Sequence, residues 1–138
     1  MRILIIDDDP AGIDILEMML KPTKADILRA SNGESGISLV KEYDPQLILL
    51  DYMLPEMDGL QITKELRKNT KAPILILSVL DDPNVLSKVL NHGADDFLVK
   101  PVSREILLAH INNLVRRTNT KHMPHSLQIS TQSIKIIE

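Results

Sequence analysis

The chain has 138 residues, of which 43% are hydrophobic and 25% are charged, with a formal net charge of −3. This length and balance fit a single soluble globular domain, and the acidic balance excludes a global positive field that would attract nucleic acid or anionic lipid. Cysteine is absent, which excludes disulfides and cysteine-based zinc sites. With no signal-peptide pattern and no apolar run of membrane-spanning length, no contact with membranes and a cytoplasmic location are expected.

Short apolar runs alternate with helical patterns along most of the chain. Five runs are predicted as strands: RILII (2–6), ADILRA (25–30), QLILL (46–50), APILILS (72–78) and DDFLVK (95–100). Segments with apolar residues at helical spacing lie between them, at 11–22, 33–43, 58–68, 83–92 and 103–117. Runs that are apolar on both sides predict strands buried on both faces, so the pattern predicts a doubly wound α/β domain with helices covering a parallel sheet.

The composition changes after Arg117. The predicted domain spans residues 1–117, and the polar segment TNTKHMPHS (118–126) is predicted to be a linker. LQISTQSIKIIE (127–138) has short alternating apolar runs around a polar centre, which predicts a hairpin. Because a lone hairpin is marginal in water, this tail is either an added strand pair or the start of a truncated second domain.

Three aspartates follow the first predicted strand, in ILIIDDDP (3–10). Like charges about 5 Å apart repel by roughly 3 kcal/mol at an effective dielectric near 20, so solvent or a cation must offset the repulsion. Asp9 precedes Pro10 and is predicted to be the N-cap of the next helix. A solvated turn explains the positions of Asp7 and Asp8 poorly.

Polar residues also end the other predicted strands: Asp51 the third, Ser78 the fourth and Lys100 the fifth. Ligands of doubly wound sheets bind where the strands end, so these side chains are expected to lie together with Asp7 and Asp8. Carboxylate oxygens suit Mg²⁺. Two plainer alternatives remain open: Lys100 as a salt-bridge partner of Asp51, and Ser78 as a strand-end hydroxyl without a role.

Nucleotide sites are less well supported by the sequence. Neither GxGxxG nor GxxxxGK[ST] is present, which argues against a dinucleotide site and a P-loop. A flavin could bind such a sheet, but the chain has one Phe, two Tyr and no Trp to stack on it.

Four segments resemble, in order and spacing, the motifs of the receiver domain of bacterial two-component response regulators: ILIIDDDP, LILLDYMLPEMDGL, PILILSV and GADDFLVKP. The resemblance covers residues 1 to about 117. Its most specific parts are D-x-x-x-P-x-x-D-G, from Asp51 to Gly59, and the later Lys100–Pro101. The GADDFLVKP stretch and Arg116–Arg117 further resemble the branch that carries a C-terminal winged-helix DNA-binding domain. The implied fold is flavodoxin-like, with five parallel strands in the order 2-1-3-4-5 and helices on both faces.

The resemblance implies roles for Asp7, Asp8 and Asp51. Asp51 is expected to accept a phosphoryl group from a sensor histidine kinase. Asp7, Asp8, Asp51 and the backbone carbonyl of Met53 are expected to hold Mg²⁺. The domain is then a phosphorylation switch that catalyses only its own phosphorylation and dephosphorylation, and it is not an enzyme acting on other substrates.

The resemblance also implies a switching apparatus. Ser78 is expected to be the switch hydroxyl, Lys100 the phosphate-binding lysine and Phe97 the switch aromatic. Phosphorylation is expected to repack the face formed by 83–92, 95–100 and 103–117, through which two copies can pair. DNA is expected to be contacted only through an output domain that this chain does not contain.

Four positions depart from the usual pattern of the family. Met53 and Leu80 stand two residues after the acceptor and the switch hydroxyl, and neither side chain can orient an attacking water, which predicts a long-lived phosphorylated state. Ile106 and His110 stand where the branch usually places a Glu and an Arg that tie its dimer, so the salt-bridged dimer is not expected and an apolar one is the alternative.

Two other classes of function remain as alternatives. One is a Mg²⁺-dependent phosphatase-like hydrolase with Asp51 as its nucleophile, although the adjacent Tyr52 and Met53 supply no acid to activate water. The other is a docking module, which needs none of the five polar residues at the strand ends. The four histidines share no metal-ligand spacing and are interpreted as surface or linker residues: His92, His110, His122 and His125.

Overall fold

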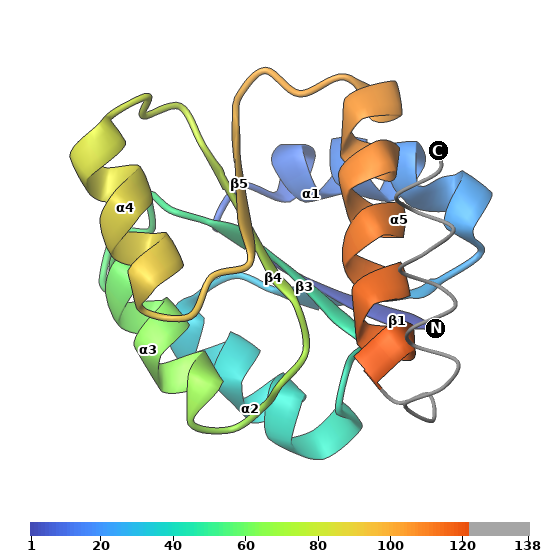
Figure 1. Cartoon of the computed structure of the whole chain (residues 1–138), viewed down its shortest axis with the longest axis horizontal. Helices are drawn as coiled ribbons and strands as arrows, with labels where there is room; N and C mark the ends of the chain where they lie inside the picture. The colour runs from blue at the N-terminus through green and yellow to red at the C-terminus, as the bar shows by residue number, and fades with distance from the viewer. Residues whose placement is uncertain (122–138) are drawn as a thin grey trace.

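Five parallel strands form one sheet in the computed structural model, which describes residues 1–121, with side chains as far as Thr118 (Figure 1). The strands run in the order β2-β1-β3-β4-β5. Their bounds are β1 Arg2–Ile6, β2 Asp26–Ala30, β3 Leu47–Asp51, β4 Ile74–Ser78 and β5 Asp96–Val99. The predicted fold class and strand order are therefore confirmed.

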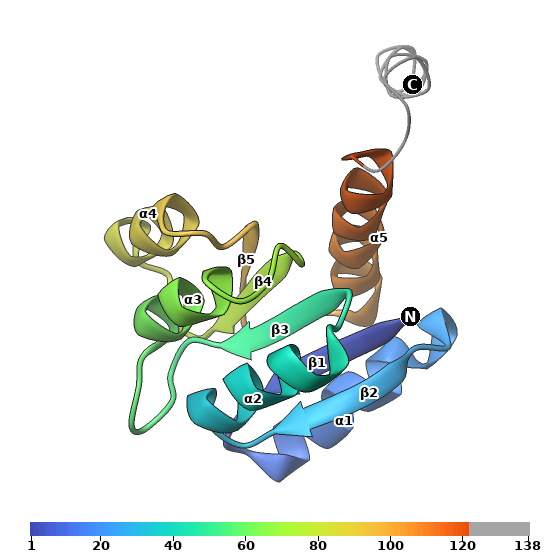
Figure 2. The same ribbon diagram turned by 90° about the horizontal axis from the view of Figure 1, so that it is seen from below.

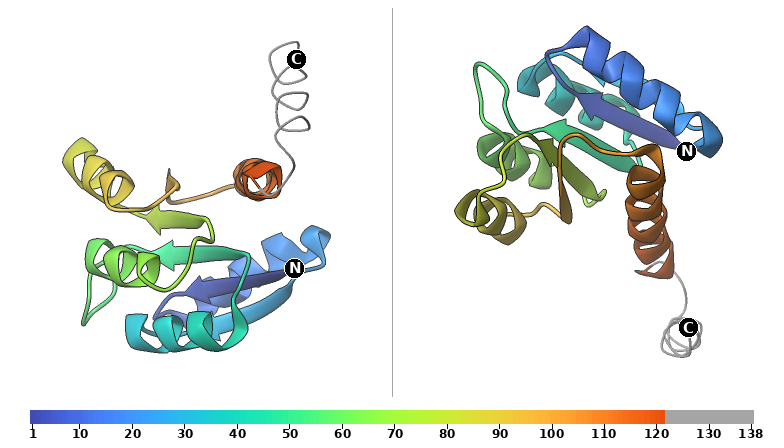
Figure 3. Two further views of the ribbon diagram at one scale, coloured as in Figure 1. Left: turned by 60° about the horizontal axis from the view of Figure 1, so that its bottom comes forward. Right: turned by 90° about the horizontal axis from the view of Figure 1, so that it is seen from above.

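Helices cover both faces of this sheet (Figures 2 and 3). Their bounds are α1 Pro10–Leu20, α2 Gly33–Tyr43, α3 Gly59–Arg67, α4 Pro83–Asn91 and α5 Arg104–Lys121, with a 3₁₀ turn (η1) at Lys21–Thr23. Helices α1 and α5 pack on one face, and α2, α3 and α4 pack on the other. Within the described residues, no helix is long and apolar enough to span a membrane.

Successive side chains of the central strands point to opposite faces of the sheet, and this divides the interior into two hydrophobic cores. In β1, Ile3 and Ile5 point toward α1 and α5, whereas Leu4 and Ile6 point toward α2, α3 and α4. The same period of two in β3 and β4 places successive side chains in the two cores, which explains why positions 47–50 and 74–77 are all apolar. Burying one such side chain contributes about 1.5–3 kcal/mol, so the two cores fix the strand ends in space.

Helices α1, α2, α3 and α4 each begin with a side-chain cap in the loop that follows a strand. The capping oxygens of Asp9, Asn32, Asp58 and Asp82 accept backbone N–H groups at 2.8–3.1 Å. The predicted N-cap role of Asp9 is thus confirmed, with Pro10 at the first helical position. A cap contributes about 1 kcal/mol, and these four hold the loops at the carboxyl edge of the sheet.

The end of the last helix differs from the prediction. Helix α5 continues to Lys121, four residues beyond the predicted end at Arg117. Residues 118–121 contain no Gly or Pro to stop a helix, and the Thr118 hydroxyl donates a hydrogen bond to the Leu114 carbonyl at 3.2 Å. The remainder of the predicted linker and the predicted hairpin, residues 122–138, lie outside the described residues.

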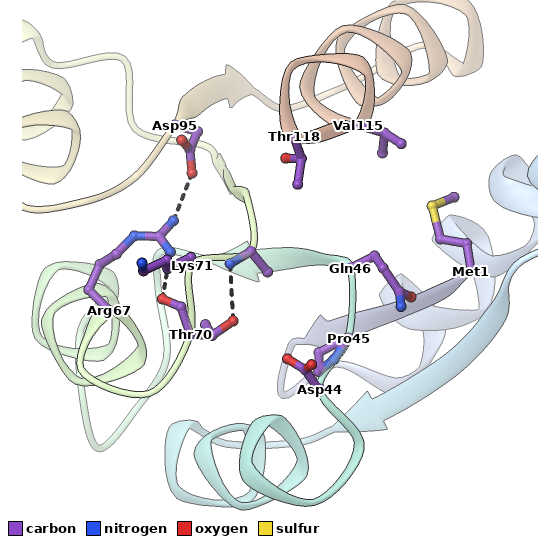
Figure 4. Close-up of a pocket in the computed structure, with 11 residues that line it drawn as sticks. Met1, Asp44, Pro45, Gln46, Arg67, Thr70, Lys71, Asp95, Val115 and Thr118 are labelled. Atoms are coloured by element: carbon purple, nitrogen blue, oxygen red, sulfur yellow. Dashed lines mark hydrogen bonds and ion pairs between the residues drawn. The ribbon is translucent and has the colours of Figure 1, made fainter. Parts of the chain in front are cut away.

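Arg67 ties the end of α3 to the start of β5, beside an open cavity of about 840 Å³ at the amino-terminal edge of the sheet (Figure 4). Its guanidinium donates to the carbonyls of Gly93 and Thr70 at 2.7 and 3.0 Å and to Asp95 Oδ2 at 2.7 Å. Asp95 Oδ2 also accepts the backbone N–H of Ile74 at 2.8 Å. The Arg67 side chain therefore satisfies polar groups of two segments, the one that follows α3 and the one that leads into β5.

Arg67→Ala is expected to lower the free energy of unfolding by about 2–4 kcal/mol, because it leaves the Gly93 and Thr70 carbonyls without this donor and the Asp95 carboxylate without its positive partner. Urea unfolding measures the change. Lys68→Ala is the matched control: Lys68 pairs with Glu65 on the exposed surface, so its loss is expected to cost no more than about 0.5 kcal/mol. Equal losses in the two variants contradict the role assigned to Arg67.

Candidate functional site

The residues predicted from the strand ends meet at the carboxyl edge of the sheet. Asp7 and Asp8 follow β1, and Asp51 is the last residue of β3. Each of these three carboxylates offers an oxygen that lies within 4.8 Å of the others. Lys100 follows β5 and reaches into the same group, with Nζ 3.7 Å from Asp51 Oδ2 and 3.8 Å from Asp7 Oδ2.

Asp7 is the most buried of the acids, with 3% of its surface exposed. Its backbone N–H donates to the Ala30 carbonyl at 3.0 Å, which extends the pairing of β1 with β2 by one residue. Its Oδ1 accepts the backbone N–H of Asp9 at 3.0 Å. The turn that precedes α1 thus fixes one carboxylate oxygen of Asp7 and leaves Oδ2 to face Lys100.

Asp51 is held in an environment that favours its neutral form. Burial, as the largest cause, raises the pKa of Asp51 from 3.8 to about 6, and the neighbouring Asp7 adds to the increase. The backbone N–H of Met53, 3.2 Å from Oδ1, and the charge of Lys100 act in the opposite direction. The local positive charge therefore does not compensate for burying this carboxylate beside Asp7.

Ser78 and Phe97 occupy neighbouring strands next to this group. Ser78 is fully buried at the end of β4; its Oγ accepts the Leu80 N–H at 3.1 Å, and its carbonyl accepts the Lys100 N–H at 2.7 Å. Phe97 is half-buried in β5 and packs against the core under α2, α3 and α4. The Ser78 backbone thus positions Lys100, and the Ser78 hydroxyl stabilises the loop that leads to α4.

The sequence interpretation missed one contact between β5 and α5. Asp96 Oδ1 accepts the N–H of Phe97 at 2.8 Å, while Asp96 Oδ2 pairs with His110 Nδ1. The sequence places His110 among surface or linker residues and at the position of a usual dimer-forming Arg, and neither interpretation predicts a pairing with Asp96. An acid at position 96, within the predicted strand, is the one sequence feature that suggests a partner. That partner, His110, is 14 residues further along the chain and could not be identified by spacing.

The donor set fits a hard divalent cation. Three carboxylates within one ion's reach supply the oxygen ligands that Mg²⁺ prefers, and the exposed Asp8 leaves the group open to solvent. The distances from Lys100 are also those of an ordinary salt bridge, so the simpler interpretation of Lys100 agrees with the geometry as well. Chemically, the arrangement places a carboxylate of raised pKa beside an ammonium group and a potential metal site.

Comparison with known sequences finds one family over most of the chain. Residues 3–112 match the response regulator receiver domain. The chain is 37% identical to "Probable transcriptional regulator ycf27" of Porphyridium aerugineum, over 98% of this chain and 58% of the relative. It is 41% identical to "Cell cycle response regulator CtrA" of Brucella ovis, over 86% of this chain and 51% of the relative. The chain thus spans about half the length of these relatives.

Solved structures agree with this assignment. A two-component response regulator from Clostridium difficile superimposes with a TM-score of 0.82 at 33% identity, over 86% of this chain and 98% of that chain. The Francisella response regulator 1452 receiver domain gives 0.78 at 32% identity, over 85% and 98%. The family match and these structures lead to one conclusion: the chain belongs to the response regulator receiver domain family and is a regulatory domain of that kind.

Proposed function

We propose that this receiver domain accepts a phosphoryl group on Asp51 from a sensor histidine kinase and passes the change to an output domain. The observation that carries the proposal is the convergence of Asp7, Asp8, Asp51 and Lys100 from three strand ends. A structural salt bridge needs one acid and one base, whereas this group contains three acids that repel one another. A cation and an incoming phosphoryl group account for all four side chains.

Asp7, Asp8, Asp51 and the backbone carbonyl of Met53 are the proposed ligands of Mg²⁺. The backbone of Met53 is already next to the site, because its N–H contacts Asp51 Oδ1 at 3.2 Å. When bound, Mg²⁺ offsets the negative charge of the acids and of the phosphoryl oxygens. The protein must otherwise supply only positioning and the charge of Lys100.

The transfer is an in-line displacement at phosphorus. An Asp51 carboxylate oxygen forms a bond to phosphorus as the bond from phosphorus to the imidazole nitrogen of the donor breaks. The electron pair of the broken bond stays on that nitrogen, which takes a proton from solvent. Lys100 stabilises the charge on the transferred oxygens, and the product is an acyl phosphate on Asp51.

The proposed response starts from the added charge at this edge of the sheet. Ser78 reorients its hydroxyl from the Leu80 N–H toward the new phosphoryl oxygens, and Phe97 turns into the space that opens. This repacks the face of α4, β5 and α5, through which two copies can pair. Ile106 is 51% exposed on that face, which supports an apolar pairing.

The output is proposed to be control of transcription through a winged-helix DNA-binding domain outside this chain. Two relatives named as regulators, one of transcription and one of the cell cycle, support it. The proposed location is the cytoplasm, where a kinase and DNA are both accessible.

The decisive experiment is intact mass after incubation with Mg²⁺ and a small-molecule phosphodonor. One added phosphoryl group on the parent protein and none on Asp51→Asn supports the proposal. Steady release of phosphate without an adduct favours the hydrolase instead. If the protein forms no adduct and releases no phosphate, the proposed phosphorylation switch is overturned and a docking module remains.

The phosphorylated state is expected to be long-lived, because Met53 and Leu80 offer no polar atom to orient water at the acyl phosphate. Met53 is 52% exposed at the mouth of the site, so a replacement reaches the attacking water without disturbing the core. Met53→Asn is expected to shorten the half-life at least about tenfold. Decay of the phosphorylated mass measures this, with Met57→Leu as the control, and release within seconds from the parent protein contradicts the prediction.

A further inference from the structure

Gly12 lies in the first turns of α1, directly beside the carboxylate of Asp7. A Cβ atom at this position would stand 3.0 Å from Asp7 Oδ2 and 3.4 Å from Asp9 Oδ2. The first distance is tighter than ordinary van der Waals contact, so any side chain at position 12 must displace the Asp7 carboxylate. The carboxylate has little freedom to adjust, because its Oδ1 is bonded to the Asp9 N–H and the residue is buried.

The missing side chain also opens space on the α1 side of the site. A groove of about 450 Å³ runs between α1 and the segment Pro101–Val102. Asp7 and Lys100 are its polar lining residues, and Gly12 is the one lining position of α1 without a side chain. Asp7 Oδ2 is therefore both unobstructed by α1 and next to open space.

Helix stability gives no reason for a glycine at this position. Glycine is a poorer helix former than every residue except proline, and alanine is the best. Gly12 has a backbone conformation within α1 that other residues adopt, since its φ is not positive. Its effect must then come from the space that it leaves.

We infer that Gly12 is a positioning residue for the metal site: by having no side chain, it lets the buried Asp7 carboxylate keep its place beside Asp8, Asp51 and Lys100. The inference rests on the proposed function. Mg²⁺ holds near-ideal octahedral geometry and retains several waters, so displacing one carboxylate by a few tenths of an ångström or filling the adjacent space weakens binding. The plain alternative is an incidental glycine on a partly exposed helix.

The test is the Mg²⁺ affinity of the whole chain, measured by calorimetric titration with MgCl₂. Gly12→Ala is expected to weaken binding roughly tenfold, the size of effect seen when the support of a metal ligand is lost, and Gly12→Val more. Both variants are also unfolded with urea. Ser38→Ala is the matched control: it also improves helix propensity, but on the exposed face of α2, away from the site.

A second readout follows the carboxylate itself. Since the Asp9 N–H donates to Asp7 Oδ1, its amide resonance in the metal-free protein is expected to shift in Gly12→Ala and to stay in place in Ser38→Ala. Weaker Mg²⁺ binding with an unfolding midpoint at or above that of the parent supports the inference.

Three results would overturn it. The first is a Gly12→Ala variant that binds Mg²⁺ as tightly as the parent. The second is a loss of affinity that comes with a lower unfolding midpoint, which indicates damage to the fold. The third is a parent protein that does not bind Mg²⁺, which also removes the metal from the proposed function. The first two results leave the proposed function intact.

Discussion

Asp51→Asn is expected to raise the free energy of unfolding of the metal-free protein by about 1–2 kcal/mol at pH 7, once solvent screening is allowed for. Burial raises the pKa of Asp51 from 3.8 to about 6, so ionising it costs more in the folded protein than in the unfolded chain. The protonated form is the one that folding favours. Stability is then highest below pH 3.8 as far as this group is concerned, falls as the pH rises to about 6, and is constant above that.

Urea unfolding between pH 4 and pH 8 in the presence of a chelator measures this effect. The parent is expected to lose stability from Asp51 as the pH rises from 4 to about 6 and to lose no more from this group between pH 6 and pH 8, whereas Asp51→Asn lacks this loss. Exposed Asp26 on β2 provides the control, with a change of no more than about 0.5 kcal/mol for Asp26→Asn. Saturating Mg²⁺ is expected to stabilise the parent more than Asp51→Asn. A destabilised Asp51→Asn contradicts the account of the site as a strained acidic group.

Lys100→Met is expected to slow phosphorylation of Asp51 by about 100-fold or more, because it removes the ammonium group that lies beside Asp51 and would stabilise the charge on the transferred oxygens. It is also expected to lower stability by about 1–3 kcal/mol, since the Lys100 ammonium lies 3.7 and 3.8 Å from two carboxylates that it partly neutralises. The initial rate of mass increase with a small-molecule phosphodonor measures the first effect, and urea unfolding measures the second.

The matched control is Lys71→Met, the same substitution at the opposite edge of the sheet, beside the cavity of Figure 4. It is expected to leave the rate unchanged. The double variant Asp51→Asn with Lys100→Met separates the contributions: loss of Lys100 is expected to cost less stability when Asp51 carries no charge. A Lys100→Met protein that is phosphorylated at the parental rate disproves the phosphate-binding role and leaves the ordinary salt bridge.

Local pattern predicted most of the fold. Strands β1, β3 and β4 each contain four consecutive Ile or Leu residues, at 3–6, 47–50 and 74–77, because both faces of the sheet are covered, and such runs are readily recognised. The convergence of Asp7, Asp51 and Lys100 followed from topology alone, since parallel strands end at one edge. The strand order came from the family resemblance and not from the periodicity of the residues.

The unpredicted features depend on what lies across space from a residue. The pairing of Asp96 with His110 joins two elements, and neither residue is unusual within its own segment. The close approach of Gly12 to Asp7 has the same origin: sequence shows a glycine in a helix but not the carboxylate oxygen 3.0 Å from its absent Cβ. Helix ends are also weakly encoded, as the continuation of α5 to Lys121 shows.

Helix α5 links two opposite edges of the sheet. It begins at Arg104, four residues after Lys100, and its 18 residues extend about 27 Å. Its far end reaches the cavity where Val115 and Thr118 lie with Met1, at the edge opposite the acids. One continuous helix therefore connects the carboxyl edge of the sheet, where Lys100 lies, to the opposite edge. In the proposed switch, a small displacement of Lys100 toward a phosphoryl group on Asp51 is therefore expected to tilt α5, with the largest movement at its far end.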